Sequence, residues 1–380
     1  MPELTSPESG IARAAHDVAT LAAHHAERAE EERQLSPEVL DAIMAAGFGR
    51  HFVGSQYGGA DGTFAALSAA VAVIGAKCPA AAWCASLAAS MARMVGYLPE
   101  EGRKQVWQDG PDVLVVGGVS PIGRAHAERD GWLLSGTWPY ISAVAHSDWA
   151  LVCGVAKSGT GYEPRLFAIP RADYRVKRTW SDVGMRATGS DTLIAEDVYV
   201  PASLSFPLAE LLEGTASSSA PRCHSVPLTT VNGLFFTLPI LGAAEGTLDL
   251  WSSYAEQKIR TWSAKQPGPA RGFYEETLAR TSGTVDAARL LLERAARVAD
   301  RGTEATPLER ARNQRDCILA ADLLVTAVNQ LFRASGTTGH SVYHPLQRLW
   351  RDANSAAGHV VLQPGPGAAA YTTSALGLDG

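Results

Sequence analysis

The chain lacks both an excess of positive charge and a long apolar run. Its 33 Lys and Arg are outnumbered by 39 Asp and Glu, which gives a formal net charge of −6. A nucleic-acid surface needs clustered excess cations that displace phosphate counterions, so nucleic acid is excluded as a partner. The N-terminus has no basic region followed by an apolar run, and no stretch reaches the ~18 uninterrupted apolar residues of a membrane span. We therefore expect a cytoplasmic protein without a membrane partner.

Patterns for metal, disulfide and dinucleotide sites are also missing. The five cysteines form no CxxC pair and are odd in number, which disfavours a disulfide framework or a zinc knuckle. No GxGxxG follows a β-type run and precedes a helical one, so no dinucleotide fingerprint is present. His340 and His344 have the spacing of a zinc pair, but Gly339 and Pro345 disfavour one continuous helix through them. We expect no metal.

The apolar pattern divides the chain into three parts. With 380 residues and 46% hydrophobic content, the chain can bury more than one packed core. Residues 11–110 repeat apolar side chains every three or four positions, which predicts helices. Residues 113–201 consist of short β-type runs separated by turn residues. Helical spacing returns over residues 226–362, with a break near residues 266–269.

This order predicts an α+β protein with three domains. We expect an N-terminal helical domain over residues 1–111, a central β domain over 112–213, and a C-terminal helical region over 214–380. Residues 364–367 read Pro-Gly-Pro-Gly, which cannot continue a helix. The end of the chain is therefore predicted to form an extended tail over the surface or onto a partner subunit.

The segment from His344 to Val361 resembles the closing catalytic segment of the acyl-CoA dehydrogenase superfamily. In the dehydrogenases a carboxylate base lies near the end of this segment, after the Arg-Asp pair. Counted without gaps, that position here is Val360, next to His359. Some dehydrogenases place the base on an earlier helix, and counting to the corresponding position in this chain gives Asn232. Because neither Val360 nor Asn232 carries a carboxylate, thioester dehydrogenation would need another base, for instance Glu245.

Two stretches of the β region, residues 136–149 and 180–201, resemble the flavin-facing segments of the same superfamily. They are most similar to its monooxygenase branch, the oxygenase components of two-component flavin-dependent hydroxylases. The resemblance implies the acyl-CoA dehydrogenase-like fold, with an N-terminal helical domain, a central antiparallel β-barrel or sandwich, and a C-terminal four-helix bundle. It also implies a homotetramer, as is usual in the superfamily.

The implied chemistry uses reduced FMN or FAD, supplied by a separate reductase, and O2. A C4a-hydroperoxyflavin would hydroxylate an aromatic substrate; a phenolic compound is expected, with a polycyclic natural product as one option. By the resemblance, Ser142 faces flavin N5 and His359 lies beside C4a, although each could instead be an ordinary packed residue. The other residues that the resemblance places near the cofactor are Gly118, Ser120, Tyr140, Trp180, Lys258, Arg260 and Arg333.

Some phenol hydroxylases of this branch carry a substrate-binding histidine on the helix before the β region. The comparable stretch here offers Ser90, Met91 and Met94 instead, which favours a bulky apolar substrate because methionine adapts to irregular shapes. His146 is a further substrate-side candidate, with a structural role as its alternative. An acyl-CoA dehydrogenase, an amino-sugar N-hydroxylase and a catalytically silent flavin-binding protein stay open as alternatives.

Overall fold

The computed structural model describes residues 10–158, 161–215, 221–263 and 270–378. Its first part is helical, as predicted. Thr63 caps one helix by accepting a hydrogen bond from the Ala66 backbone, and Pro79 opens the next in the first-turn position that tolerates proline. The helices of this part are α1 (Gly10–Glu32), α2 (Pro37–Ala45), α3 (Phe64–Gly75), α4 (Pro79–Val95) and α5 (Glu100–Val106). Nearly every residue of α4 is buried, so this helix runs through the interior of the protein.

A seven-stranded sheet follows, in the order β5-β6-β2-β1-β3-β4-β7. The prediction of a fully antiparallel sheet was wrong at one pair, because β1 and β3 run parallel. The chain reaches β3 from β2 through the short η2 helix (Val144–His146), which returns it beside the start of β1. The strands are β1 (Val115–Glu128), β2 (Gly131–Ile141), β3 (Trp149–Ser158), β4 (Gly161–Pro170), β5 (Arg175–Lys177), β6 (Asp191–Pro201) and β7 (Ser205–Pro207).

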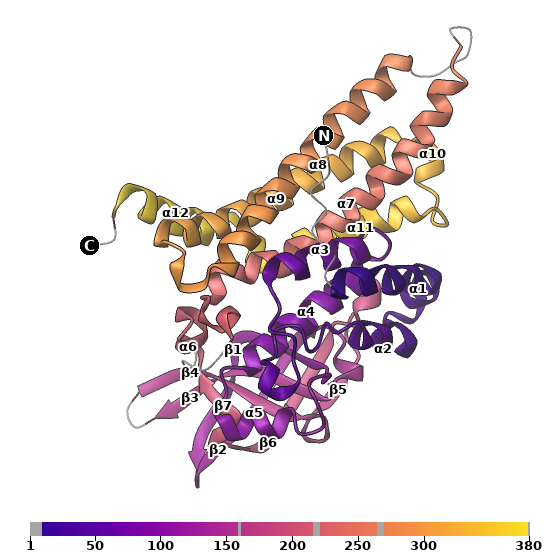
Figure 1. Ribbon diagram of the computed structural model, residues 1–380. Helices are drawn as coiled ribbons and strands as arrows, with labels where there is room; N and C mark the ends of the chain where they lie inside the picture. The colour runs from indigo at the N-terminus through magenta and orange to yellow at the C-terminus, as the bar shows by residue number, and fades with distance from the viewer. Residues whose placement is uncertain (1–9, 159–160, 216–220, 264–269, 379–380) are drawn as a thin grey trace.

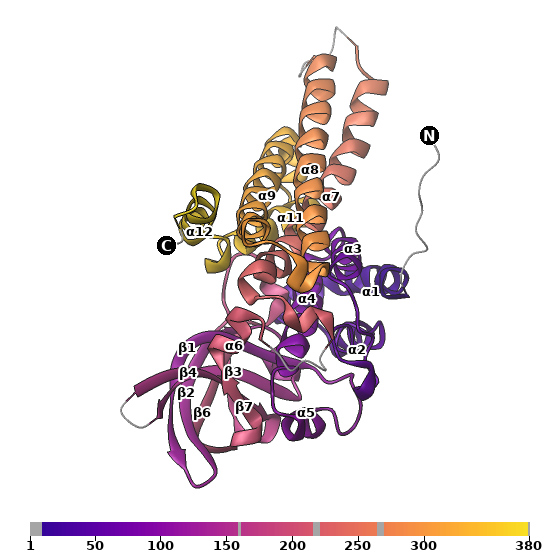
Figure 2. The same ribbon diagram turned by 60° about the vertical axis from the view of Figure 1, so that its left-hand side comes forward.

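The remaining helices are α6 (Leu208–Glu213), α7 (Leu228–Arg260), α8 (Arg271–Asp300), α9 (Pro307–Ala334), α10 (Gly336–Gly339), α11 (Pro345–Ala357) and α12 (Pro364–Leu376). α7 is the central one, since it packs against α3, α4, α8, α9 and α11. The sheet lies at one end of the molecule, whereas α7 and α8 project from the other (Figure 1 and Figure 2). The predicted break near residues 266–269 lies outside the described residues.

Two helices, α7 and α9, are long and apolar enough to cross a membrane by length and composition alone. In α7, 83% of the most apolar window is buried, as expected for a helix at the centre of a folded core. The corresponding window of α9 is 39% buried, because one side of this helix faces outward.

The extended tail predicted for the end of the chain was wrong, because residues from Pro364 onward form α12. Proline cannot continue a helix, but its fixed φ angle suits the first turn of a new one, and Pro364 occupies that position. α12 packs against α9, where Gly367 lies against Ile318. The sequence argument treated this proline as a helix terminator and overlooked that it also starts helices.

Candidate active site

A cavity with a volume of about 670 Å³ lies where the helices meet the sheet. Its walls come from α4, the first part of α7, the ends of β1 and β2, residues 180–190, and the segment that follows α11. Cavities of about 300–1,000 Å³ with apolar walls and a few polar groups are typical of cofactor and small-molecule sites. This cavity is therefore the candidate active site.

Ser142 lies at the end of β2, on the wall of this cavity, and is held in a chain of hydrogen bonds. The indole Nε1–H of Trp83 donates to the Ser142 hydroxyl oxygen at 3.1 Å. The Ser142 and Ser190 hydroxyls are 2.8 Å apart, and those of Ser190 and Thr188 are 2.7 Å apart. Thr188 in turn donates to the backbone carbonyl of Met185 at 2.9 Å. With Thr188 donating to Met185, Ser190 donates to Thr188 and Ser142 donates to Ser190. Ser142 can offer its proton to a ligand when this chain reverses, so that Thr188 donates to Ser190 and Ser190 donates to Ser142.

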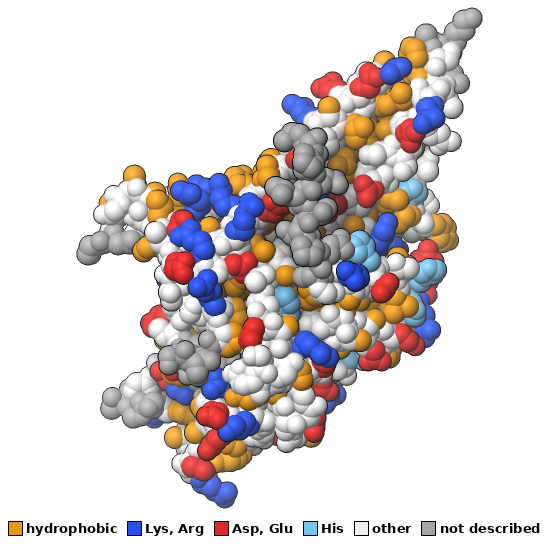
Figure 3. Space-filling model, in the orientation of Figure 1, with side chains coloured by type: hydrophobic (Ala, Val, Ile, Leu, Met, Phe, Trp, Pro, Cys, Tyr) orange, Lys and Arg blue, Asp and Glu red, His pale blue; other side chains and the backbone are white. Residues whose placement is uncertain are grey.

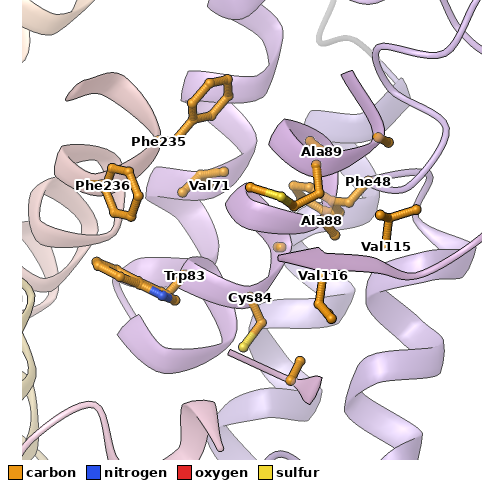
Figure 4. Close-up of a cluster of buried hydrophobic side chains, with 14 of the residues drawn as sticks. Phe48, Val71, Trp83, Cys84, Ala88, Ala89, Val115, Val116, Phe235 and Phe236 are labelled. Carbon is orange, nitrogen blue, oxygen red and sulfur yellow. The ribbon is translucent and has the colours of Figure 1, made fainter. Parts of the chain in front are cut away.

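His359 lies directly after α11, on the wall of the same cavity. Its ring stacks on Phe236 with centroids 3.9 Å apart and meets the edge of Trp83 at 5.7 Å. Figure 4 shows Trp83 and Phe236 side by side, reaching toward each other from α4 and α7. Burial lowers the pKa of His359 to about 4, so its ring is neutral at physiological pH. Nδ1 accepts from the Val361 backbone at 3.3 Å, which leaves the proton on Nε2 as a donor.

Residues 183–185 of the cavity wall are clamped onto α11. The Asp352 carboxyl accepts a hydrogen bond from the Met185 backbone at 2.6 Å, and Arg351 donates to the Val183 carbonyl at 2.6 Å. Arg351 is held in turn by an ion pair with Glu30 of α1 at 2.6 Å. Gly184 packs so tightly against α11 that a side chain there would collide with the Arg351 backbone. The clamp therefore fixes this wall relative to His359.

Three cavity residues have backbones in the left-handed region, which non-glycine residues rarely adopt. Their φ angles are 64° for Tyr140, 57° for Ala143 and 53° for Met185. Such a conformation costs about 1–3 kcal/mol and persists only where the surrounding structure imposes it. The Ala143 backbone, for example, donates to the Thr188 carbonyl at 2.8 Å. Strain concentrated at this cavity is consistent with a functional site.

Most of the predicted site residues line this cavity. Tyr140 is 73% exposed and meets Trp180 edge to face at 6.3 Å, while the Trp180 indole donates to the Met185 and Arg186 carbonyls at 3.1 Å. Both lie at the open side of the cavity, beside the exposed Val183 and Val360. The predicted residues that line the cavity are Ser90, Met91, Met94, Gly118, Ser120, Tyr140, Ser142, Trp180 and His359.

Four predicted site residues lie outside this cavity. His146 is in η2, where its Nε2 is buried without a hydrogen-bond partner among the described residues, and it does not reach the cavity wall. Lys258 lies 22 residues beyond Phe236 on α7, which corresponds to about 33 Å along a helix. Arg260 forms an ion pair with Glu256 on the helix surface, and Arg333 is exposed near the end of α9. The three cations are therefore remote from this cavity within one chain.

The cavity-wall residues that the sequence argument did not assign to the site include Trp83, Ser190, Phe236 and Asn232. Trp83 and Phe236 are isolated aromatic residues in helices, which are more often simple core. Ser190 was part of a quoted β-region stretch, but its contact with Ser142 depends on a turn that spacing does not reveal. Asn232 could have been found from the sequence, because it occupies the alternative position of the dehydrogenase base. It was considered only as a missing carboxylate.

A flavin ring matches the chemistry of this cavity. Such a ring is flat and largely apolar, with polar atoms along its edge, and the cavity combines apolar walls with donors at Ser142 and His359. Asp182 is the only carboxylate on the wall, and no Lys or Arg lines it, within the part of the chain that the structure describes. The phosphate of a flavin would therefore need cations from outside this cavity.

Comparison with known proteins agrees with this geometry. Residues 234–364 match the family described as "Acyl-CoA dehydrogenase, C-terminal domain". The chain is 29% identical over 364 residues to the flavin-dependent monooxygenase oxygenase subunit HsaA of Rhodococcus jostii, covering 93% of this chain and 94% of HsaA. It is 27% identical over 396 residues to the FADH2-dependent resorcinol hydroxylase oxygenase component of a Rhizobium strain, covering 100% and 97% of the two chains.

Solved structures give the same result. XiaF from Streptomyces, determined in complex with FADH2 and glycerol, superimposes with a TM-score of 0.89 at 26% identity, covering 97% of this chain and 95% of XiaF. The acyl-CoA dehydrogenase-like fold predicted from the sequence is thereby confirmed. Over nearly its whole length the chain is therefore similar to flavin-dependent monooxygenase oxygenase subunits, and its C-terminal helical part matches the acyl-CoA dehydrogenase family.

Proposed function

We propose that this protein is the oxygenase component of a two-component flavin-dependent monooxygenase that hydroxylates an aromatic, phenolic compound. One observation carries the proposal. Ser142 and His359 offer neutral hydrogen-bond donors to one cavity, while Val360 and Asn232 stand where a dehydrogenase would need a carboxylate. When bound, reduced FMN or FAD supplies two electrons to O2, so that one oxygen atom enters the substrate ring and the other leaves as water.

Different residues of the cavity have different roles in this reaction. Ser142 turns its hydroxyl proton toward the edge of the flavin ring when the chain reverses so that Ser190 donates to it, and Trp83 fixes the position of the Ser142 oxygen. His359 holds a proton at Nε2 on the wall of the same cavity without bringing a positive charge into it. The apolar walls exclude water, which limits the loss of reducing equivalents as hydrogen peroxide.

At the two positions where dehydrogenases carry their base this cavity has Val360 and Asn232, and Asp182, the only carboxylate on the described wall, is exposed at the open side. Glu245, the remaining candidate, lies in α7 and forms an ion pair with Arg289 of α8, and it does not line the cavity. Burial raises the pKa of Glu245 to about 7, but a proton acceptor must reach the substrate before its pKa matters. Hydroxylation is therefore favoured over thioester dehydrogenation.

We also propose that the protein acts as a homotetramer with a separate reductase. Lys258, Arg260 and Arg333 are remote from the cavity of their own chain, whereas the flavin phosphate needs cations. A neighbouring subunit can supply these residues across the helical region. Hydrophobic side chains lie along the projecting ends of α7 and α8 (Figure 3). The large hydrophobic side chains that are exposed on or next to α7, α8, α9 and α11 include Trp262, Phe273, Leu290, Leu319, Val342 and Tyr343.

Isotope labelling tests the proposed reaction. The full chain, mixed with chemically reduced FMN or FAD, a phenolic substrate such as 2-naphthol and ¹⁸O-labelled O2, should yield a hydroxylated product that carries one ¹⁸O atom. Incorporation of oxygen from water, or turnover of a CoA thioester with an artificial electron acceptor, would overturn the proposal. A hydroxylated amino sugar as the preferred product would support N-oxidation instead.

A further inference from the structure

Two polar side chains at the inner end of the cavity have no partner. Ser90, in α4, is 1% exposed and lines the cavity, and its hydroxyl forms no hydrogen bond with any described residue. Asn232, in the first turns of α7, is partly buried on the same wall, and its amide is likewise unpaired within the described residues. Buried polar groups are normally hydrogen-bonded, so two unpaired ones that face one cavity indicate a ligand.

The packing of α4 against α7 brings these two side chains to the same level. Ser86 of α4 donates to the Phe235 carbonyl of α7 at 2.8 Å, and Arg93, further along α4, donates to the Val226 carbonyl just before α7. The two helices therefore run antiparallel between these contacts. Ser90 lies between Ser86 and Arg93, and Asn232 lies between Val226 and Phe235, so the two face each other across the cavity.

The surroundings of this pair are apolar and uncharged. Leu87, Met91, Met94, Leu114 and Phe236 line the same region. Asp182, the only carboxylate on the described cavity wall, is exposed at the open side. No Lys or Arg among the described residues lines the cavity, and the guanidinium of Arg93, one turn along α4 from Ser90, is directed at the Cys223 and Val226 carbonyls. An anionic group at the inner end would therefore lose its hydration without a cation on the wall to compensate.

We propose that Ser90 and Asn232 form a binding site for the uncharged hydroxyl group of an apolar aromatic substrate. A neutral hydroxyl both donates and accepts, and the pair matches it, because an amide offers a donor and an acceptor and a serine offers either. The proposal rests on the proposed function and adds its substrate class: a neutral phenol, bound as phenol rather than phenolate, without a carboxylate elsewhere on the molecule.

The position of this site orients the substrate relative to the flavin-facing residues. Ser90 lies seven residues after Trp83, whose indole reaches Ser142, and seven helical residues span about 10 Å. A substrate whose hydroxyl is held by Ser90 and Asn232 therefore extends its rings past Met91 toward Phe236 and His359. The site thereby selects which end of the molecule approaches the flavin.

Calorimetric titration of the full chain with 2-naphthol, naphthalene and 2-naphthoate tests the site without requiring oxygen chemistry. In the wild type, 2-naphthol should bind at least about tenfold more tightly than 2-naphthoate. Ser90→Ala and Asn232→Leu should each weaken 2-naphthol binding by about two- to tenfold and leave naphthalene binding unchanged or stronger. Thr230→Val is the matched control, because Thr230 is a buried residue of α7 whose hydroxyl also has no partner among the described residues and which does not line the cavity.

Equal effects of Ser90→Ala and Asn232→Leu on 2-naphthol and naphthalene would overturn the site, because only general packing would then be lost. Unchanged 2-naphthol binding in both variants would also overturn it, as would tighter binding of 2-naphthoate. A selective loss of 2-naphthol binding in a protein that incorporates no oxygen from O2 would support the site and refute the proposed reaction. The two proposals therefore fail separately.

Discussion

The indole N–H of Trp83 donates to the Ser142 hydroxyl oxygen at 3.1 Å, and the same indole meets His359 edge to face at 5.7 Å. One residue of the buried helix α4 thus contacts both groups that are expected to face the flavin. Because Trp83 occupies an acceptor lone pair of Ser142, the hydroxyl proton must point elsewhere, toward Ser190 or into the cavity.

Trp83→Phe should therefore weaken the function of Ser142 without removing its hydroxyl. We expect the hydrogen peroxide released per turnover to rise by about two- to fivefold, because a neutral hydrogen bond of about 0.5–1.5 kcal/mol is lost. Ser142→Ala should have a larger effect, about tenfold. Peroxide and product are measured together in single-turnover reactions.

Trp107→Phe provides the control, since Trp107 is buried, its Nε1 has no hydrogen-bond partner among the described residues, and it does not line the cavity. Equal peroxide release in the Trp83 and Trp107 variants would contradict the assigned role of Trp83.

The state of His359 predicts how peroxide release depends on pH. Burial lowers the pKa of His359 to about 4, so the ring gains a proton only well below neutral pH. The fraction of turnovers that yields product should therefore show no His359-dependent change between about pH 6 and pH 8. His359→Gln, which keeps an N–H donor, should retain more product formation than His359→Leu, by about two- to tenfold. A transition near pH 6.5 that disappears in His359→Leu would show that a charged imidazolium is needed.

The contact between Gly184 and α11 predicts a stability effect. In Gly184→Ala, the added methyl group would collide with the Arg351 backbone, so residues 183–185 would have to move away from α11. We expect a loss of about 1–3 kcal/mol in the free energy of unfolding and weaker flavin binding, measured by denaturant titration and fluorescence quenching.

Gly283→Ala is the matched control for this substitution. Gly283 lies inside α8 with nothing within 4 Å of an added Cβ, so alanine should stabilise the protein by up to about 1 kcal/mol through its helix propensity. If Gly184→Ala lowered the free energy of unfolding by less than about 0.5 kcal/mol, this would contradict the clamp of residues 183–185 onto α11.

The buried Asp352 predicts a dependence of stability on pH. Burial raises its pKa to about 7 in the folded state, while an unfolded aspartate has a pKa of about 3.9. The unfolded chain therefore releases this proton first, and Asp352 costs the folded state stability as pH rises from about 4 to about 7, by at most about 1.4 kcal/mol per pH unit.

Asp352→Asn removes this titration but keeps an oxygen that accepts from the Met185 backbone. The variant should match the wild type near pH 4 and exceed its free energy of unfolding by about 1 kcal/mol or more near pH 8. Denaturant titrations at the two pH values measure this difference. A variant that is less stable than the wild type at both values would show that the carboxyl is needed as such.

Much of the site could be predicted from the sequence, because its residues lie in local motifs with a fixed order. Ser142, Trp180 and His359 come from three separate stretches, and all of them line one cavity. Asn232 was reached by counting residues, but its role was not recognised because that role depends on Ser90. The packing of α4 against α7, which brings the two residues together, cannot be predicted from apolar spacing. The roles of these residues stay predictions until the experiments are made.

The fold shows the same division between local and long-range information. The apolar period located the helical and β regions, because it reports which face of each element is buried. It could not report the parallel pairing of β1 with β3, since strands of either direction share the same alternation. Lys258 and Arg333 were assigned to the cofactor by resemblance, and their distance from the cavity became visible only in three dimensions.

Stopped-flow mixing of the protein and anaerobically reduced FMN with oxygenated buffer tests the central claim most directly. The account predicts a transient species that forms with O2 and persists before the absorbance of oxidised flavin returns. Its lifetime should shorten by about tenfold in Ser142→Ala and in His359→Leu, but not in the Trp107→Phe control. Direct return to oxidised flavin in the wild-type protein, with no such species, would contradict the account.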